Sequence, residues 1–170
     1  MLGLVYGGSG SGKSAWAEER LLDLSRSGSR VYLATMRPEG GEERILRHRR
    51  RRQDRGFATL ECYGTLIGLA PPPGTSLLLE CAGNLLANLM FDSPGQGEAA
   101  ELAWQGITGL GERVDNLLVV SNDIFADGGE VTPAVRDYQV ALAWLNRRLA
   151  QAAAEVVEVV AGYPVYFRRA

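Results

Sequence analysis

The chain has 170 residues, of which 46% are apolar and 22% charged, and its formal net charge is −2. This length and composition predict a globular protein with its own buried core. The slightly acidic balance argues against a surface built mainly to bind nucleic acid, and the chain has no run of about 18 apolar residues that could cross a membrane.

Cysteine usage and the N-terminus indicate the compartment. Cys62 and Cys81 are the only cysteines, and they lack the paired spacing of a zinc site or a disulfide framework. The first residues lack the basic and apolar regions of a signal peptide. We therefore expect a cytoplasmic protein, with neither a membrane nor a nucleic acid as a partner.

Apolar runs rich in β-branched residues alternate with helical patterns along the chain. The expected strands are 2–6, 30–35, 76–80 and 116–122, with two shorter strands in 155–168 around Gly162. The expected helices are 13–26, 42–53, 83–91, 98–113 and 133–154, the last with Thr132 as N-cap and Pro133 at its first position.

This order predicts an α/β fold in which helices cover both faces of a mainly parallel sheet, with a short antiparallel strand at the C-terminus. The loops at 71–74 and 92–98 are too short to separate domains, so residues 1–170 are expected to form a single domain. Binding sites in such folds lie at the carboxyl ends of the strands, which is where candidate residues are sought.

The segment "GGSGSGKS" between the first strand and the first helix matches the pattern G-x-x-x-x-G-K-[ST]. Its residues are Gly7, Gly8, Ser9, Gly10, Ser11, Gly12, Lys13 and Ser14. Glycines let backbone N–H groups turn inward around a phosphate, and the helix N-terminus adds partial positive charge. Lys13, the only lysine of the chain, is expected to reach the phosphates, and the Ser14 hydroxyl to bind Mg²⁺. The motif predicts a P-loop NTPase-like three-layer sandwich; a glycine-rich turn without a nucleotide is the alternative.

A carboxylate is also expected near the metal. Glu80 ends an apolar strand, and Asp123 follows another, so both would lie at the edge of the sheet that faces the phosphates. Glu80 is the better candidate because no turn separates it from its strand. The alternative for either residue is a carboxylate that only caps the next helix.

The only histidine, His48, lies in the arginine-rich helix expected at 42–53. Arg44, Arg51 and Arg52 share its face. A charged run of this kind is usually a solvated surface, and a strip that binds RNA is another interpretation. The arginines would also attract phosphates and lower the pKa of the imidazole, and a neutral imidazole can attack phosphorus.

Several motifs together resemble the bifunctional adenosylcobinamide kinase / adenosylcobinamide-phosphate guanylyltransferase family of cobalamin biosynthesis. The quoted stretches are "GGSGSGKSAWAEE" (7–19), "VYLAT" (31–35), "ERILRH" (43–48), "TLE" (59–61), "LLLEC" (77–81) with "NL" (88–89), "VVSND" (119–123), "VTPAVRDY" (131–138) and "LNRRLA" (145–150). The phosphate motif alone would not identify a family, whereas an R-I-x-x-H helix followed by T-x-E and L-L-E-C is far more selective.

The resemblance implies two activities that use ATP or GTP with Mg²⁺. It implies that His48 carries a covalent GMP and that the family's homotrimer is shared by this chain. The residues that would then contact nucleotide, besides Gly7–Ser14, are Ala34, Thr35, Met36, Arg49, Arg50, Arg51, Arg52, Glu61 and Glu80.

Some positions depart from the family pattern. In the stretch after His48, residues 51–57 read "RRQDRGF"; this stretch is one residue longer than usual, with Phe57 where tryptophan is common. Asp123 stands where glutamate is common, and Gly83 where threonine is usual after E-C. Two other functions therefore stay open: a P-loop kinase without guanylyl transfer, and a nucleotide-dependent RNA-binding switch. A purely structural domain has little support once the phosphate motif is accepted.

Overall fold

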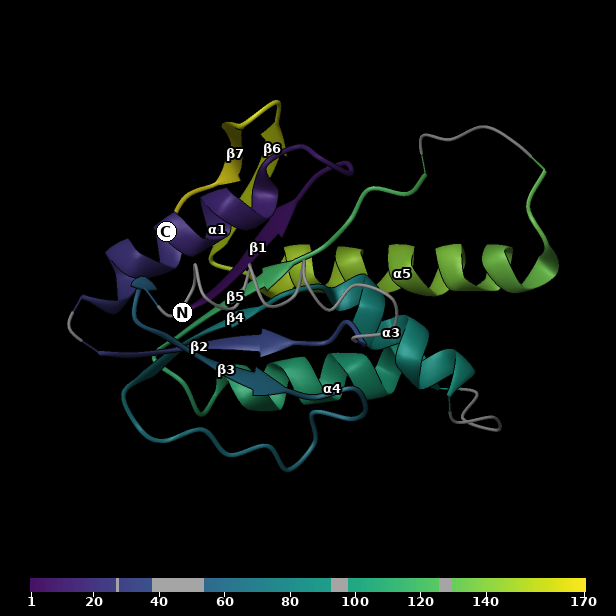
Figure 1. Ribbon diagram of the computed structural model, residues 1–170. Helices are drawn as coiled ribbons and strands as arrows, with labels where there is room; N and C mark the ends of the chain where they lie inside the picture. The colour runs from purple at the N-terminus through teal and green to yellow at the C-terminus, as the bar shows by residue number, and fades with distance from the viewer. Residues whose placement is uncertain (27, 38–53, 93–97, 126–129) are drawn as a thin grey trace.

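The computed structural model describes residues 1–26, 28–37, 54–92, 98–125 and 130–170, and its strands form one seven-stranded sheet (Figure 1). The strands are β1 (Leu2–Tyr6), β2 (Ser29–Ala34), β3 (Phe57–Glu61), β4 (Thr75–Leu79), β5 (Asn116–Val120), β6 (Glu155–Val160) and β7 (Tyr163–Arg168). Their order across the sheet is β3-β2-β4-β5-β1-β6-β7. Neighbours pair in parallel except β6 and β7, which are antiparallel. The mainly parallel sheet with an antiparallel C-terminal strand is therefore confirmed.

Helices cover both faces of this sheet. They are α1 (Lys13–Ser25), α3 (Ala82–Phe91), α4 (Ala99–Gly111) and α5 (Pro133–Ala152). Helix α1 packs on one face against β4 and β5, whereas α3, α4 and α5 pack against one another on the other face (Figure 1). The predicted three-layer sandwich is confirmed.

Strand β4 shows why the central strands are apolar throughout. All five of its residues are buried. Leu77 and Leu79 belong to the core beneath α3, α4 and α5, and Leu78 belongs to the smaller core beneath α1. Because successive side chains of a strand point to opposite faces, a strand covered on both sides needs a continuous apolar run.

The predicted elements differ from the observed ones mainly at β3. This strand was not predicted, because the stretch "FATLE" includes polar residues and only Phe57 is fully buried. It pairs with β2 alone, at the edge of the sheet, so its conformation depends on a partner that is distant in sequence. The helix expected at 42–53 lies outside the described residues.

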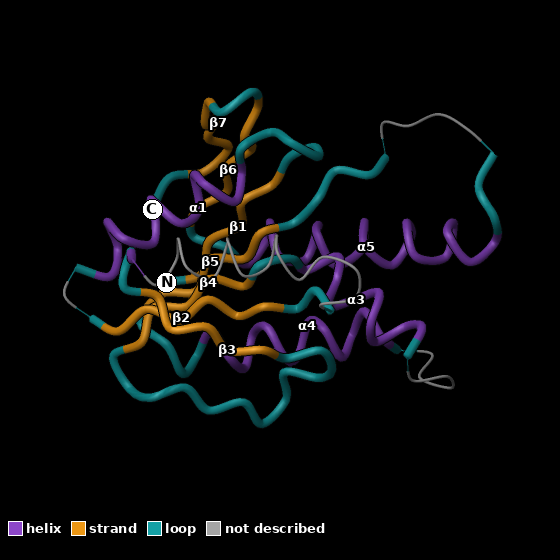
Figure 2. The backbone as a smooth tube through the Cα atoms, viewed as in Figure 1, coloured by secondary structure: helices purple, strands orange, loops and turns teal. Residues whose placement is uncertain are grey.

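The other elements agree with the prediction to within a few residues. Thr132 caps α5 as expected, its Oγ1 accepting from the backbone N–H of Val135 at 3.4 Å. The long loop between β3 and β4 runs beside α4 (Figure 2), where Leu66 contacts Gly106. Within the described ranges, no helix combines the length and apolarity that crossing a bilayer requires.

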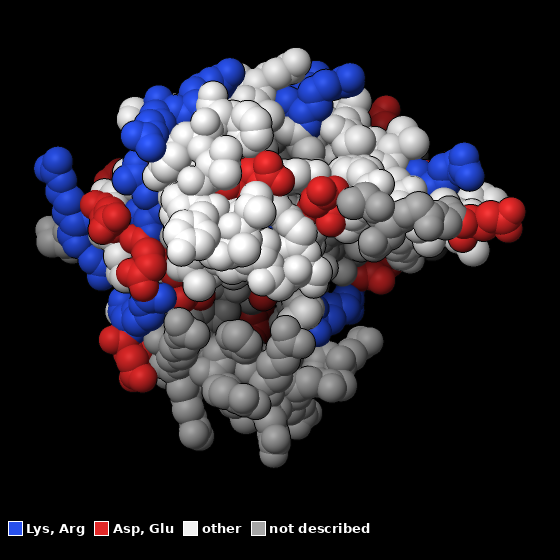
Figure 3. Space-filling model, turned by 90° about the horizontal axis from the view of Figure 1, so that it is seen from above, with Lys and Arg blue, Asp and Glu red and all other residues white. Residues whose placement is uncertain are grey.

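Figure 3 shows how charged side chains are distributed over one face of the molecule. Basic and acidic side chains of the described residues form small groups of both signs, and uncharged surface lies between one group and the next (Figure 3). On this face the charges are therefore mixed in sign.

Candidate functional site

The loop between β1 and α1 forms a tight backbone turn at the carboxyl edge of the sheet. Gly10 and Gly12 have positive φ angles of 72° and 90°, which side chains other than glycine rarely adopt. A Cβ on Gly12 would lie 3.2 Å from Cα of Gly162, so the backbone approaches closely there. Both requirements explain why glycine occupies these positions of the phosphate motif.

Lys13 begins α1 and lies over this loop. Its side chain is buried, with 8% of the residue exposed, and Nζ donates to the carbonyl oxygen of Gly8 at 3.0 Å. Burial lowers the pKa of the Lys13 ammonium, and the nearby Cys81 acts in the opposite direction. A cation that has lost water contacts in this way is stabilised by an anion placed beside it.

Two serines adjoin the loop. Ser14 is exposed in the first turn of α1, so its hydroxyl is accessible. The hydroxyl of Ser11 is buried, and among the described residues it has no hydrogen-bond partner. A buried hydroxyl without a partner is costly, which fits a site that is completed by a polar ligand.

Glu80 follows β4 and holds the segment that comes after β2. Its Oε2 accepts from the backbone N–H groups of Thr35 at 3.2 Å and Met36 at 3.5 Å. Thr35 is further fixed because its Oγ1 donates to the carbonyl oxygen of Cys81 at 3.0 Å. The structure thus brings the predicted nucleotide segment Ala34–Met36 into contact with the predicted carboxylate.

Asp123, the other candidate carboxylate, follows β5, the strand that pairs with β1 on the side of β4. Its backbone N–H donates to the carbonyl oxygen of Gly7 at 3.0 Å, and its Oδ1 accepts from Phe125 N at 3.1 Å. Its carboxylate also bonds to the hydroxyl of Tyr6. Burial, together with Asp123 and Glu158, raises the pKa of Tyr6 to about 12. Asp123 therefore anchors the start of the phosphate loop.

Cys81 is the N-cap of α3, a role that the sequence did not suggest. Its Sγ accepts from Asn84 N at 3.4 Å and from Asn122 Nδ2 at 3.3 Å. Burial raises the pKa of the Cys81 thiol. The thiol thus joins the end of β4, the loop after β5 and the start of α3.

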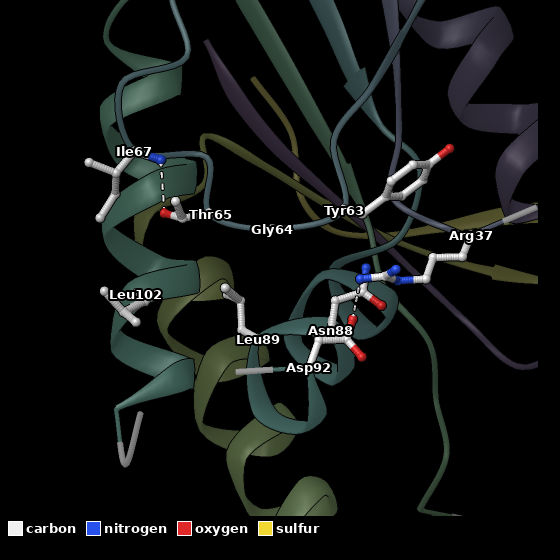
Figure 4. A pocket seen from close by; sticks show the side chains of 9 residues that line it. All are labelled: Arg37, Tyr63, Gly64, Thr65, Ile67, Asn88, Leu89, Asp92 and Leu102. Atoms are coloured by element: carbon white, nitrogen blue, oxygen red, sulfur yellow. Dashed lines mark hydrogen bonds and ion pairs between the residues drawn. The ribbon is translucent and has the colours of Figure 1, made fainter. Parts of the chain in front are cut away.

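A cavity of about 540 Å³ lies between the loop that follows β3 and helices α3 and α4 (Figure 4). Arg37, Tyr63, Gly64, Thr65, Asn88 and Asp92 supply its polar lining, and Ile67, Leu89 and Leu102 its apolar lining. We call it the Arg37 cavity. The sequence analysis did not predict its polar residues. Two of them, Arg37 and Tyr63, could have been found because each comes two or three residues after the end of a strand.

Glu61 ends β3 at the edge of this region, where its Oε2 accepts from the hydroxyl of Tyr63 at 2.8 Å. Of the arginines between positions 44 and 55, Arg55 lies within the described residues. It pairs with Glu18 at 2.8 Å and with Glu19, both on α1. His48 and its neighbours Arg44, Arg47, Arg49, Arg50, Arg51 and Arg52 lie outside the described residues.

Few side chains of the described residues could hold a metal. No group of three or more His, Cys, Asp or Glu residues comes together among them. A serine hydroxyl and one carboxylate, with phosphate oxygens and water completing the shell, is the donor set that Mg²⁺ takes in nucleotide sites. Ser14 and Glu80 fit that description.

Comparison with known proteins agrees with this geometry. A family model described as "Cobinamide kinase / cobinamide phosphate guanyltransferase" matches residues 3–167. The bifunctional adenosylcobalamin biosynthesis protein CobP of Pseudomonas aeruginosa is 31% identical over 97% of this chain and 96% of its own. The bifunctional adenosylcobalamin biosynthesis protein CobU of Escherichia coli is 29% identical over 97% and 98%.

Solved structures show a similar fold at low sequence identity. A KaiC-like protein of Pyrococcus horikoshii has a TM-score of 0.52 at 11% identity, over 92% of this chain and 69% of its own. The ATPase domain of G40P has a TM-score of 0.52 at 10% identity, over 92% and 68%. These likenesses support a P-loop NTPase-like fold, and the family match supplies the identity: the chain belongs to the cobinamide kinase / cobinamide phosphate guanyltransferase family.

Proposed function

We propose that this chain phosphorylates adenosylcobinamide with ATP or GTP and then transfers GMP from GTP to the product, giving adenosyl-GDP-cobinamide. The observation that carries this proposal is the buried Lys13 over the glycine loop, in a chain that belongs to this family. Gly7–Ser14 would bind the nucleotide phosphates, and Ala34–Met36 would line the rest of the nucleotide site, tied to Glu80.

In the kinase step, the hydroxyl of the aminopropanol arm attacks the γ-phosphorus of the nucleotide. The bond from that phosphorus to the β–γ bridging oxygen breaks, the nucleoside diphosphate leaves, and the hydroxyl proton is released. Lys13 and the inward N–H groups of the loop would stabilise the charge on the transferring group. Ser14 and Glu80 would hold Mg²⁺, which supplies further neutralisation of phosphate charge when bound.

In the guanylyl step, a neutral ring nitrogen of His48 attacks the α-phosphorus of GTP and pyrophosphate leaves. A phosphate oxygen of adenosylcobinamide phosphate then attacks the same phosphorus, and the bond to His48 breaks. Splitting the reaction avoids a direct displacement between two crowded anions. Arg49–Arg52 would offset the negative charge, and Glu61 and Glu80 would contact GTP.

The family resemblance also leads us to propose a homotrimer, which light scattering coupled to size-exclusion chromatography can test. The cytoplasmic location and the lack of a nucleic-acid or membrane partner stay predictions.

The deciding experiment incubates the protein with Mg²⁺ and GTP labelled at the α-phosphate, then denatures it and measures the retained label. The expected result is acid-labile, alkali-stable label from α-labelled but not γ-labelled GTP, and none on His48→Asn. Lys13→Ala is run beside it to show whether labelling needs the phosphate loop.

A wild-type protein that transfers γ-phosphate to adenosylcobinamide but retains no α-label would contradict His48 as the nucleophile. The longer stretch after His48 would then mark a kinase without guanylyl transfer.

A further inference from the structure

The Arg37 cavity has two chemically different walls. On the polar side, Arg37 Nη2 pairs with Asp92 Oδ2 at 2.6 Å, yet the two side chains remain 44% and 42% exposed. The guanidinium carbon lies 5.7 Å from the centre of the Tyr63 ring. On the apolar side, the lining residues are Ile67, which is 52% exposed, and Leu89 and Leu102 (Figure 4).

The polar side can bond to both halves of an amide. A guanidinium has five N–H donors and a carboxylate has about four acceptor positions. The ion pair between Arg37 and Asp92 uses only some of them, so the remaining donors and acceptors are open to water or to a ligand. A carbonyl oxygen would accept from Arg37 while the neighbouring NH₂ group donates to Asp92. The half-exposed Ile67 offers an apolar surface opposite these groups.

The cavity adjoins the proposed nucleotide site through two hydrogen-bonded links. Asn88, which lines the cavity, donates from Nδ2 to the carbonyl oxygen of Thr35 at 2.9 Å, and Thr35 N donates to Glu80. Tyr63, which also lines it, donates to Glu61. A molecule held in the cavity would therefore lie at the same sheet edge as the phosphates.

We propose that the Arg37 cavity binds the corrin end of the acceptor, cobinamide, an inference that rests on the proposed function. Cobinamide is a macrocycle that carries methyl groups and several primary amides, so it presents both surfaces that the cavity complements. A volume of about 540 Å³ lies within the range of small-molecule sites.

The test compares Ile67→Asp with the control Val140→Asp. Both change an exposed apolar residue to aspartate, and Val140, which is 67% exposed on α5, does not line the cavity. Adenosylcobinamide binding is measured by equilibrium dialysis, using the visible absorbance of the corrin, and GTP binding is measured separately. Steady-state KM values for both substrates are determined for each protein.

We expect Ile67→Asp to weaken adenosylcobinamide binding about tenfold, with a parallel rise in its KM, because an apolar contact is replaced by a charge. GTP affinity should stay within about twofold of wild type, because a change of that size corresponds to only a small fraction of the free energy of binding. Asp92→Asn, which keeps the shape of the side chain, should weaken adenosylcobinamide binding to a smaller extent. Val140→Asp should behave as wild type.

Equal adenosylcobinamide binding by Ile67→Asp and Val140→Asp, in a protein that still phosphorylates the acceptor, would overturn the docking site and leave the proposed function standing. Loss of GTP affinity in Ile67→Asp without loss of adenosylcobinamide affinity would assign the cavity to the nucleotide instead. A wild-type protein that neither binds nor phosphorylates adenosylcobinamide would overturn both proposals.

Discussion

The backbone N–H of Gly162 donates a hydrogen bond of 2.8 Å to the carbonyl oxygen of Ser11. This contact joins the turn between β6 and β7 to the phosphate loop. Ala161 and Gly162 both have positive φ angles, 50° and 85°, which is the backbone of a tight two-residue turn. The C-terminal hairpin therefore supports the loop on which Lys13 depends.

Gly12→Ala should damage both the fold and the nucleotide site. The backbone at this position would force alanine to adopt a φ of 90°. The new Cβ would also lie 3.2 Å from Cα of Gly162. We expect a loss of about 1–3 kcal/mol in the free energy of unfolding, and GTP affinity should fall about tenfold or more because the backbone N–H groups shift. Urea denaturation and calorimetric titration measure the two effects.

The matched control for that substitution is Gly109→Ala. Gly109 lies within α4, and a Cβ there would meet nothing within 4 Å. This variant should gain about 0.5–1 kcal/mol, because alanine favours a helix over glycine. Equal stability of the two variants would contradict a special requirement for glycine at position 12.

The choice between Glu80 and Asp123 as the magnesium carboxylate can be tested with isosteric amides. Glu80→Gln should raise the Mg²⁺ concentration needed for half-maximal phosphoryl transfer about tenfold, since a carboxylate ligand loses its charge. Asp123→Asn should leave that concentration nearly unchanged, because we assign Asp123 to holding the start of the phosphate loop, where its backbone N–H donates to the carbonyl oxygen of Gly7. The reverse pattern would make Asp123 the ligand.

Alkaline pH should destabilise the protein through two partly buried tyrosines, Tyr6 and Tyr138. The pKa of Tyr6 is raised to about 12 by burial and by Asp123, and that of Tyr138 to about 12 by burial. The unfolded chain releases these protons near pH 10, so between pH 10 and about 12 the folded state binds more protons than the unfolded state. Stability therefore falls as pH rises through this window.

In a pH titration of the folded protein, part of the tyrosinate absorbance near 295 nm should therefore appear only at a pH above that of ordinary tyrosines; we call this part the late component. Tyr6→Phe should remove part of it and flatten the loss of stability above pH 10, whereas Tyr163→Phe, on an exposed side chain, should leave it intact. A single titration with no late component in the folded wild type would contradict the burial of these hydroxyls.

Gly83 and Tyr138 should be energetically coupled. A Cβ on Gly83 would lie 2.8 Å from the Tyr138 hydroxyl, so Gly83→Ala should cost about 1 kcal/mol through overpacking. In a Tyr138→Phe background the hydroxyl is gone, and the same change should become neutral or stabilising because alanine favours the helix. A double-mutant cycle by urea denaturation measures the difference, and additive effects would show that the two positions are independent.

Much of the candidate site could be predicted from the sequence because its requirements are local. A strand, a glycine loop and a helix N-terminus are consecutive, so the pattern around Lys13 predicts a phosphate site from neighbouring residues alone. Glu80 was predicted at the end of a strand, and it follows β4 directly; its contact with Thr35 and Met36 became apparent only in the structure. His48 remains a prediction from the family resemblance.

Apart from β3, the sequence by itself determined the order of the described strands and helices and the glycine loop before α1, since apolar periodicity and glycine requirements act over neighbouring residues. The tertiary structure alone decided that "FATLE" becomes an edge strand, because its pairing with β2 supplies hydrogen bonds that a short polar stretch does not specify. It also decided that Asn88 meets Thr35 and that Gly162 meets Ser11. Such contacts join residues about 50 to 150 positions apart, and they form only where the packing of the whole sheet brings those residues together.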